Sequence, residues 1–286
     1  MKEIRRKPND RRIKQNRQGD AEYLTFPLLE GTGLVRHLFS TRLGGVSAGI
    51  FSSMNLSYTR GDEKAAVDEN YRRIAAMLGC EPADIVCSDQ THTTNIRAVD
   101  ERDRGKGVLR PKDYTDIDGL ITNTPGIVLA TFYADCVPLF FIDTEKKAVG
   151  LSHSGWRGTV GRIGQKTIEA MQKAYGTRPE DVAAAIGPSI CQDCYEVSED
   201  VAEAFYREFH RPGQGEALLF AKGNGKYQLD LWRANRIVLE EAGVLPGKIQ
   251  VTDICTCCNP DYLFSHRASR GKRGNSGAFL GLLPVN

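Results

Sequence analysis

The chain has 286 residues, of which 41% are hydrophobic and 26% are charged. These values are ordinary for a globular protein and exclude a collagen, a coiled coil or a wholly disordered chain. The formal net charge is +2, but residues 1–20 contain eight basic and three acidic residues, so this stretch carries +5 and the remainder −3. A slightly acidic body is a poor general nucleic-acid binder, and we expect no nucleic-acid partner.

The basic stretch at the start of the chain has few apolar side chains. We therefore expect residues 1–20 to form a flexible tail and residues 21–286 to form one domain. No apolar segment follows the basic residues, as a secretory signal would require, and the apolar stretch 126–142 is interrupted by Asp135. The eight cysteines are too sparse for a secreted disulfide scaffold. These features predict a cytoplasmic protein without a membrane partner, whose cysteines are reduced or bind metal.

Along the chain, short β-branched or aromatic runs are interspersed with stretches of helical periodicity. Strands are predicted at residues 35–40, 85–88, 95–99, 119–122, 128–133, 139–143, 148–153 and 249–253. Helices are predicted at residues 63–78, 158–174, 198–209 and 231–242, the first with Asp62 as N-cap and Gly79 at its end. Since strict βαβ alternation is absent, we predict a single mixed α/β (α+β) domain with mixed β-sheets flanked by helices.

Several common enzyme signatures are missing. The sequence has no G-x-G-x-x-G after a strand and no Walker-A motif, which excludes the usual dinucleotide-binding and P-loop classes. H-E-x-x-H and G-x-S-x-G are also absent, as is the H-x-E and P-C-x-x-C pattern of nucleobase deaminases.

Three short segments each place a possible metal ligand in or beside a predicted strand. They contain His92 after the strand at 85–88, Cys136 after the strand at 128–133, and His153 at the end of the strand at 148–153. Two imidazoles and one thiolate form a three-ligand site whose fourth position is open, as in catalytic zinc sites, although copper also accepts these ligands. Spacing alone leaves open a buried core thiol and two hydrogen-bonded histidines.

A series of motifs extends this pattern over about residues 30–285. They are Phe39-Ser40-Thr41-Arg42-Leu43-Gly44-Gly45-Val46-Ser47, Gln90-Thr91-His92, Asp118-Gly119-Leu120-Ile121-Thr122, Ala134-Asp135-Cys136-Val137-Pro138, His153-Ser154-Gly155-Trp156-Arg157-Gly158, Ile186-Gly187-Pro188-Ser189-Ile190 and Cys255-Thr256-Cys257-Cys258-Asn259-Pro260. In content and order they resemble the YfiH/laccase-domain family.

The resemblance implies a YfiH-like catalytic domain, distantly like the cysteine-hydrolase domain of cytotoxic necrotizing factor. It implies a Zn²⁺ ion held by His92, Cys136 and His153. It also implies a monomeric purine nucleoside phosphorylase that acts on adenosine, inosine and methylthioadenosine with phosphate, and that deaminates adenosine.

Seven further residues are candidates for catalysis or substrate binding. Asp135 is a candidate acid/base next to the thiolate, although on a continuous strand it would point away from Cys136, so a structural role stays open. Arg157 at a helix start, Arg42 in a glycine-containing turn and Arg267 near the C-terminus suit phosphate. Arg270 and Arg273 in the same glycine-rich segment are phosphate candidates too, although an exposed basic loop stays open for them. Gln90 is a candidate for binding substrate or orienting His92.

Two alternative functions use the same residues. A copper-dependent polyphenol oxidase, the older description of family members, would need more histidines than the five present. A cysteine hydrolase that edits peptidoglycan precursors would use Cys136 as nucleophile and His92 or His153 as base.

The cysteines near the end of the chain form a separate group. Cys191 and Cys194 form a C-x-x-C motif that, with Cys255, Cys257 and Cys258, allows a second zinc site or a disulfide. Since these residues do not repeat the spacing of a zinc ribbon, we expect reduced structural thiols.

Overall fold

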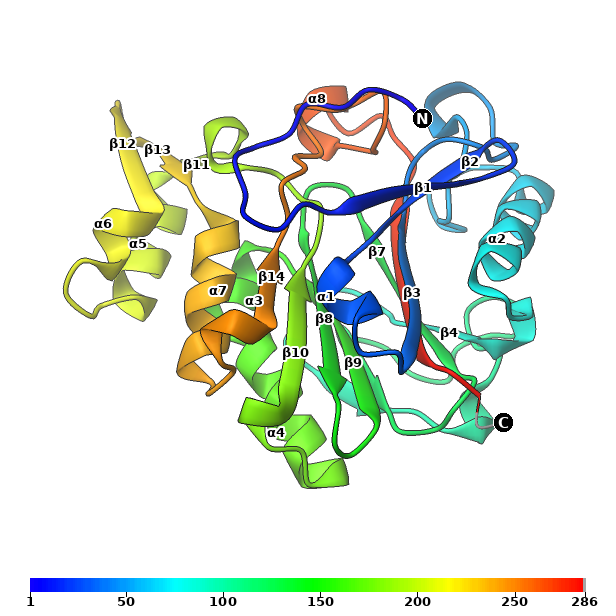
Figure 1. Cartoon of the computed structure of the whole chain (residues 1–286). Helices are drawn as coiled ribbons and strands as arrows, with labels where there is room; N and C mark the ends of the chain where they lie inside the picture. The colour runs from blue at the N-terminus through cyan, green and yellow to red at the C-terminus, as the bar shows by residue number, and fades with distance from the viewer. Residues whose placement is uncertain (285–286) are drawn as a thin grey trace.

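Two six-stranded sheets, packed face to face, form the centre of the molecule in the computed structural model, which describes residues 1–284 (Figure 1). In spatial order the first sheet consists of β1 (Lys14–Gln18), β2 (Ala21–Thr25), β3 (Val35–Ser40), β15 (Ser276–Leu282), β7 (Val128–Tyr133) and β4 (Ile85–Cys87). The second consists of β14 (Ile249–Val251), β10 (Val182–Ile186), β8 (Val137–Asp143), β9 (Ala148–Ser154), β6 (Gly119–Thr122) and β5 (Ile96–Ala98). Both sheets are mixed, because β4–β7, β5–β6 and β10–β14 pair in parallel while the other neighbours are antiparallel.

Helices cover the outer faces of the two sheets. On the first sheet lies α2 (Lys64–Leu78), whose Val67, Tyr71 and Ile74 pack against the strands. The other helices are α1 (Pro27–Glu30), α3 (Trp156–Val160), α4 (Ile163–Tyr175), α5 (Glu199–Glu208), α6 (Gln214–Leu218), α7 (Leu231–Glu241) and α8 (His266–Ser269). Of these, α4 and α7 pack on the second sheet, and a small sheet of β11 (Glu196–Ser198), β13 (Lys226–Leu229) and β12 (Leu219–Gly223) lies at one side with α5 and α6.

Strand β8 shows why the core has two halves. Its alternate side chains Phe140 and Ile142 point between the sheets, whereas Leu139 and Phe141 point toward the helices. A strand buried on both faces reads as a continuous apolar run, as this one does. The layered arrangement confirms the predicted mixed α/β fold. No helix among residues 1–284 is both long and apolar enough to cross a membrane.

The predicted helix at 158–174 is wrong in one respect, because it is two helices. Arg162 has a φ of 58°, in the left-handed region, and this residue separates α3 from α4. The N-cap of α2 is Glu63 rather than Asp62, whereas Gly79 ends this helix in the left-handed conformation as predicted.

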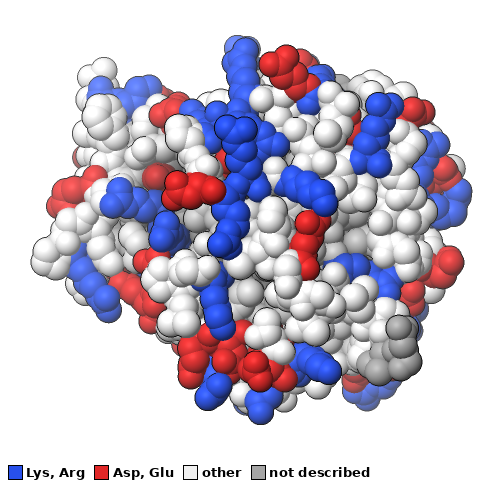
Figure 2. All heavy atoms as spheres, viewed as in Figure 1, with Lys and Arg blue, Asp and Glu red and all other residues white. Residues whose placement is uncertain are grey.

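The prediction of a solvated N-terminal tail is also wrong for the described structure. Strand β1 pairs with β2, Ile13 is 1% exposed, and the backbone N–H of Lys7 donates to the carbonyl of Asp253 at 2.8 Å. The basic side chains find acidic partners: Arg6 pairs with buried Asp253 at 2.5 Å, and Lys7 pairs with Asp193 at 2.6 Å. In Figure 2 basic side chains form a band over the part of this face where Figure 1 draws the N-terminal segment. The basic segment therefore neutralises carboxylates of the acidic body.

Replacing Arg6 by alanine is expected to destabilise the fold by roughly 3 kcal/mol, since it leaves the carboxylate of Asp253 buried without its cation. Chemical denaturation of Arg6→Ala and of Arg12→Ala measures this difference. Arg12 is exposed and serves as the matched control, with an expected change within about 0.5 kcal/mol. Equal stability of the two variants would show that the Arg6–Asp253 ion pair does not stabilise the fold.

His37 predicts a pH dependence of stability. Its ring packs against Phe26 and Phe140, and its Nε2 accepts the backbone N–H of Phe26 at 2.9 Å. Burial lowers the pKa of His37 to about 4. Because the unfolded chain binds the proton more tightly, with a pKa near 6.5, this contribution is fully present above that pH and is lost as the pH falls toward 4. Between pH 7 and pH 4.5 the wild type should lose roughly 2 to 3 kcal/mol more than His37→Gln, measured by denaturant unfolding. An equal loss in both proteins would contradict this assignment.

Candidate active site

His92, Cys136 and His153 meet where three loops and strand ends converge between the two sheets. The possible ligand atoms of the three side chains all lie within 4.8 Å of one another, and Cys136 Sγ lies 4.0 Å from His92 Nε2. His153 is buried on β9, Cys136 is half-buried directly before β8, and His92 is exposed in the loop after β4. The fold thus brings together His92 and Cys136, which are 44 positions apart in the sequence, and His153, 17 positions after Cys136.

Asp118, directly before β6, organises this group. Its buried carboxylate forms a hydrogen bond with His153 Nδ1 at 2.8 Å. It also accepts hydrogen bonds from the backbone N–H groups of Thr91, His92 and Thr93, at 3.0, 3.1 and 2.8 Å. A carboxylate on Nδ1 sets the tautomer of an imidazole and directs Nε2 toward the remaining side of the ring. Asp118 therefore orients one histidine directly and the other through its backbone.

The local backbone is unusual at two of these positions. His92 and Asp135 have φ values of 66° and 92°, which non-glycine residues rarely adopt and which cluster at functional sites. In addition, a Cβ on Gly155 would lie 2.9 Å from His92 Cδ2 and 3.2 Å from Cys136 Sγ. Only glycine allows the backbone between β9 and α3 to approach both side chains so closely.

The electrostatics favour an ionised thiol. Burial opposes the charged form, but the charge of His153 and hydrogen bonds with both imidazoles outweigh it and lower the pKa of Cys136 to about 6. Burial lowers the pKa of His153, but the thiolate of Cys136 and the carboxylate of Asp118 outweigh this effect and raise the pKa to about 9.

The donor set fits a metal ion. Nδ1 of His153 is occupied by Asp118, so Nε2 of both histidines and the sulfur of Cys136 remain as donors, and two nitrogens with one sulfur suit Zn²⁺ or copper. Zinc–nitrogen and zinc–sulfur distances of about 2.0 and 2.3 Å place such donors less than 4 Å apart, slightly closer than they lie here. A small contraction around the ion completes a three-ligand site.

A pocket of about 420 Å³ opens onto these three residues. Its lining includes three aromatic residues, Tyr58, Tyr71 and Phe132. It also includes three basic residues, Arg60, Lys112 and Arg273, and one acidic residue, Asp89, so the charged part of the lining is mainly basic. Sequence reasoning did not identify Arg60 or Lys112, because neither belongs to one of the motifs. Asp118 was missed as a functional residue, although a charged residue directly before an apolar strand was a signal that could have identified it.

Two of the predicted site residues lie beside the cluster. Gln90 lines the pocket, where its side-chain oxygen accepts the N–H of Phe132 at 2.7 Å and its amide donates to the Phe132 carbonyl at 2.8 Å. Both carboxylate oxygens of Asp135 are engaged away from the thiol, with the hydroxyl of Thr256 and the backbone N–H of Arg267, each at 2.7 Å. This arrangement favours the structural alternative for Asp135.

Of the five predicted arginines, Arg273 lines this pocket and the other four do not. Arg42 donates to the carbonyls of Ser52 and Pro260 at 2.8 and 2.7 Å, and Arg267 donates to the carbonyl of Glu196 at 2.8 Å, so both guanidinium groups fix loops. Arg157 is exposed and stacks over Trp156 at 4.3 Å.

The fold and the site define a mixed α/β protein with an open His–Cys–His centre beneath a pocket whose charged lining is mainly basic. Residues 36–283 match the family described as multi-copper polyphenol oxidoreductase laccase, and the chain belongs to this family. It is 42% identical to a purine nucleoside phosphorylase of Deinococcus radiodurans, with 90% of this chain and 93% of that protein covered. It is 37% identical to the purine nucleoside phosphorylase YlmD of Bacillus subtilis (85% and 87% covered) and 36% identical to the adenosine deaminase RL5 of an unknown prokaryote (80% and 87% covered). The crystal structure of Bacillus licheniformis YfiH is similar, with a TM-score of 0.87, 33% identity and 94% and 98% of the chains covered.

Proposed function

We propose that this protein is a cytoplasmic, monomeric, zinc-dependent purine nucleoside phosphorylase that also deaminates adenosine. The observation that carries the proposal is the His92–Cys136–His153 centre at the base of a pocket with both aromatic and basic walls. Relatives with 37% and 42% identity over most of the chain bear the name purine nucleoside phosphorylase, and one with 36% identity is an adenosine deaminase.

The pocket walls match the two parts of a nucleoside reaction with phosphate. Phe132 is half-buried at the pocket wall and offers a face for a purine base, since aromatic rings stack on planar groups. Phosphate would bind at the basic part of the lining, where guanidinium groups give charge-assisted hydrogen bonds. When bound, zinc supplies Lewis-acid chemistry that stabilises negative charge developing on the reacting group.

Arg273 is the strongest candidate for holding phosphate. Its Nε is buried and has no hydrogen-bond partner among the described residues, while Nη1 donates to the Gly274 carbonyl and to the Asn275 side chain. Buried polar atoms are normally satisfied, so a ligand oxygen is the natural partner for this Nε. Asp135, Arg42 and Arg267 would then act by fixing the loops around the site rather than on the substrate, and exposed Arg157 would pack on Trp156.

Replacing Arg273 by glutamine should raise the KM for phosphate about 10- to 100-fold and change the KM for adenosine little, since a hydrogen bond to a charged group contributes roughly 1.5 to 3 kcal/mol. The measurement is adenine release from adenosine at varied phosphate, followed by mass spectrometry. Arg270→Gln is the matched control, because Arg270 is exposed in the same segment and does not line the pocket. Equal effects on both substrates in Arg273→Gln would place phosphate elsewhere, and no phosphate-dependent release by the wild type would refute the proposed function.

Two other reactions of the same centre are separated by simple measurements. Stoichiometric copper with phenol turnover would indicate the oxidase. Activity that survives chelation but is blocked by a thiol alkylator would indicate a hydrolase with Cys136 as nucleophile.

A further inference from the structure

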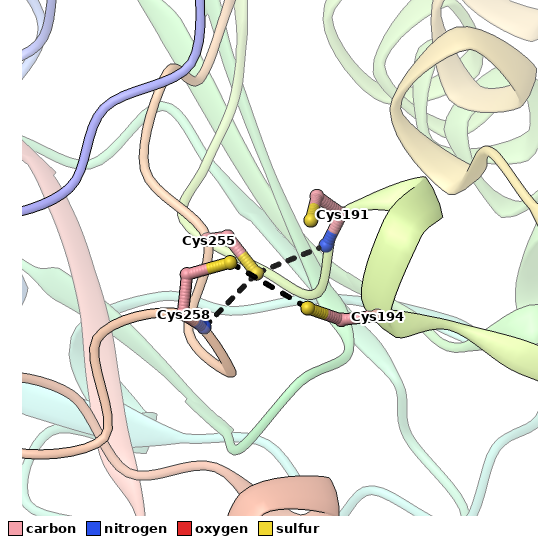
Figure 3. Close-up of side chains that lie close together, drawn as sticks. All are labelled: Cys191, Cys194, Cys255 and Cys258. Carbon is pink, nitrogen blue, oxygen red and sulfur yellow. Dashed lines mark hydrogen bonds between the residues drawn. The ribbon is translucent and has the colours of Figure 1, made fainter.

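A second cluster of metal-ligand side chains lies at the carboxyl ends of β10 and β14. These two strands pair in parallel, and the ladder continues through a bridge between Ser189 and Cys255 and a 3.1 Å hydrogen bond from Thr256 N–H to the Ser189 carbonyl. The chain leaving β10 carries Cys191 and Cys194, and the chain leaving β14 carries Cys255 and Cys258. Two C-x-x-C motifs more than sixty residues apart are therefore placed side by side by sheet register (Figure 3).

The four sulfur atoms are close enough together to coordinate one metal ion. All lie within 4.8 Å of one another, and the sulfurs of Cys194 and Cys258 are 3.5 Å apart. Cys255 Sγ accepts the backbone N–H groups of Cys191 at 3.2 Å and of Cys258 at 3.4 Å, as Figure 3 shows. A tetrahedral zinc with bonds of about 2.3 Å requires sulfurs roughly 3.8 Å apart, so only small shifts of the side chains are needed.

Burial and charge around the cluster also suit a tetrathiolate. Cys191 and Cys255 are 4% and 0% exposed, whereas Cys194 and Cys258 are half-buried and leave a route for the ion. When zinc binds, each of the four thiols releases its proton to solvent and forms one Zn–S bond, which gives the centre a net charge of −2. N–H donors to sulfur and the neighbouring ammonium group of Lys7 offset this charge. The hydrogen bond to Asp193 is the main cause that raises the pKa of Lys7, and nearby Cys191 and Cys258 add to it.

We propose that Cys191, Cys194, Cys255 and Cys258 bind a structural Zn²⁺ ion, separate from the His92–Cys136–His153 centre. Four protein ligands close the coordination sphere, which is the arrangement of structural rather than catalytic zinc. This proposal replaces the expectation of plain reduced thiols, because the ladder supplies the spacing that the sequence does not display.

Hydrogen bonds connect the four-cysteine cluster to the His92–Cys136–His153 centre. Ile190, directly before Cys191, donates its N–H to the Asp135 carbonyl at 3.0 Å, and Thr256, directly after Cys255, donates its hydroxyl to the Asp135 carboxylate at 2.7 Å. Asp135 precedes Cys136 and has a left-handed backbone. The zinc would thus fix the two segments that hold this strained residue, and with it the thiolate of the first centre.

The test isolates the second site by removing the first. In a His92→Ala/His153→Ala background, elemental analysis should find one zinc ion per chain, and Co²⁺ in its place should give the intense visible absorption of tetrahedral thiolate coordination. Adding Cys194→Ser should abolish both signals. Adding Cys257→Ser should preserve them, since Cys257 lies in the same loop but outside the four-sulfur group. Neither readout depends on enzymatic activity, so failure here is distinguishable from failure of the proposed function.

Chelation of the wild-type chain gives a check that needs no substitution in the cluster. An alkylating reagent should modify Cys257 in zinc-loaded protein but spare the four ligand cysteines, and chelation should expose them. No zinc in the double-alanine background, zinc that survives Cys194→Ser, or fewer than eight titratable thiols in the unfolded chain, which indicates a disulfide, would each overturn the proposal.

Discussion

Replacing Cys136 by serine is expected to reduce phosphorolysis of adenosine by roughly a hundred- to a thousandfold, the effect typical of losing a group that stabilises transition-state charge. Cys136 lies 4.0 Å from His92 Nε2 and is the sulfur donor of the centre. A serine hydroxyl stays protonated near neutral pH and is a poor zinc ligand, so zinc at this centre should be lost with the activity, whereas zinc at the four-cysteine site should stay bound. Initial rates and metal content, measured on the same preparation, check this expectation.

Cys80→Ser is the matched control for this substitution. Cys80 is half-buried at the end of α2, belongs to neither group of possible metal ligands, and should keep both zinc and activity. Full activity in Cys136→Ser would contradict the assignment of Cys136. Full zinc without activity would favour Cys136 as a nucleophile.

Replacing Asp118 by asparagine should have the second large effect. The variant keeps the shape of the side chain but presents an amide N–H₂ group where the wild type accepts N–H donors from His153 and from residues 91–93. Loss of a carboxylate partner behind a ligand histidine weakens metal affinity about 10- to 100-fold. The unmet buried donors should also lower the free energy of unfolding by roughly 1 to 3 kcal/mol.

Competition with a chelator measures the affinity, and denaturant unfolding measures the stability of Asp118→Asn. The control is Asp116→Asn, because Asp116 is exposed in the same turn and its side chain accepts only the hydroxyl of Thr91, at 2.8 Å. If both variants bind zinc as the wild type does, Asp118 does not orient the centre.

The sequence allowed the fold class and the three residues of the first centre to be predicted, because both are encoded locally. Apolar runs identify strands such as β7 and β8, and His92, Cys136 and His153 each belong to a distinctive motif. Strand β10 was missed because its Val-Ala-Ala-Ala-Ile run has low strand propensity, and it forms a strand because β8 and β14 pair with it on both sides.

What depends on contacts between distant segments could not be predicted in this way. The role of Asp118 requires the loop after β4 to meet β9, and the placement of Arg273 in the pocket requires β15 to return beside β7. The four clustered cysteines likewise come together only through the parallel pairing of β10 with β14. Arg42 and Arg267 illustrate the reverse case, since a guanidinium group suited to phosphate is used here to hold backbone carbonyls.

The most direct test of the central claim follows the oxygen atoms of phosphate through the reaction. Zinc-loaded protein is incubated with adenosine and isotopically labelled phosphate, and the products are analysed by mass spectrometry with Cys136→Ser alongside. Phosphorolysis at the His92–Cys136–His153 centre predicts labelled ribose 1-phosphate in an amount equal to the free bases adenine and hypoxanthine together, and none of these products from the variant. Free ribose, release of free base that does not require phosphate, or unchanged turnover by Cys136→Ser would contradict it.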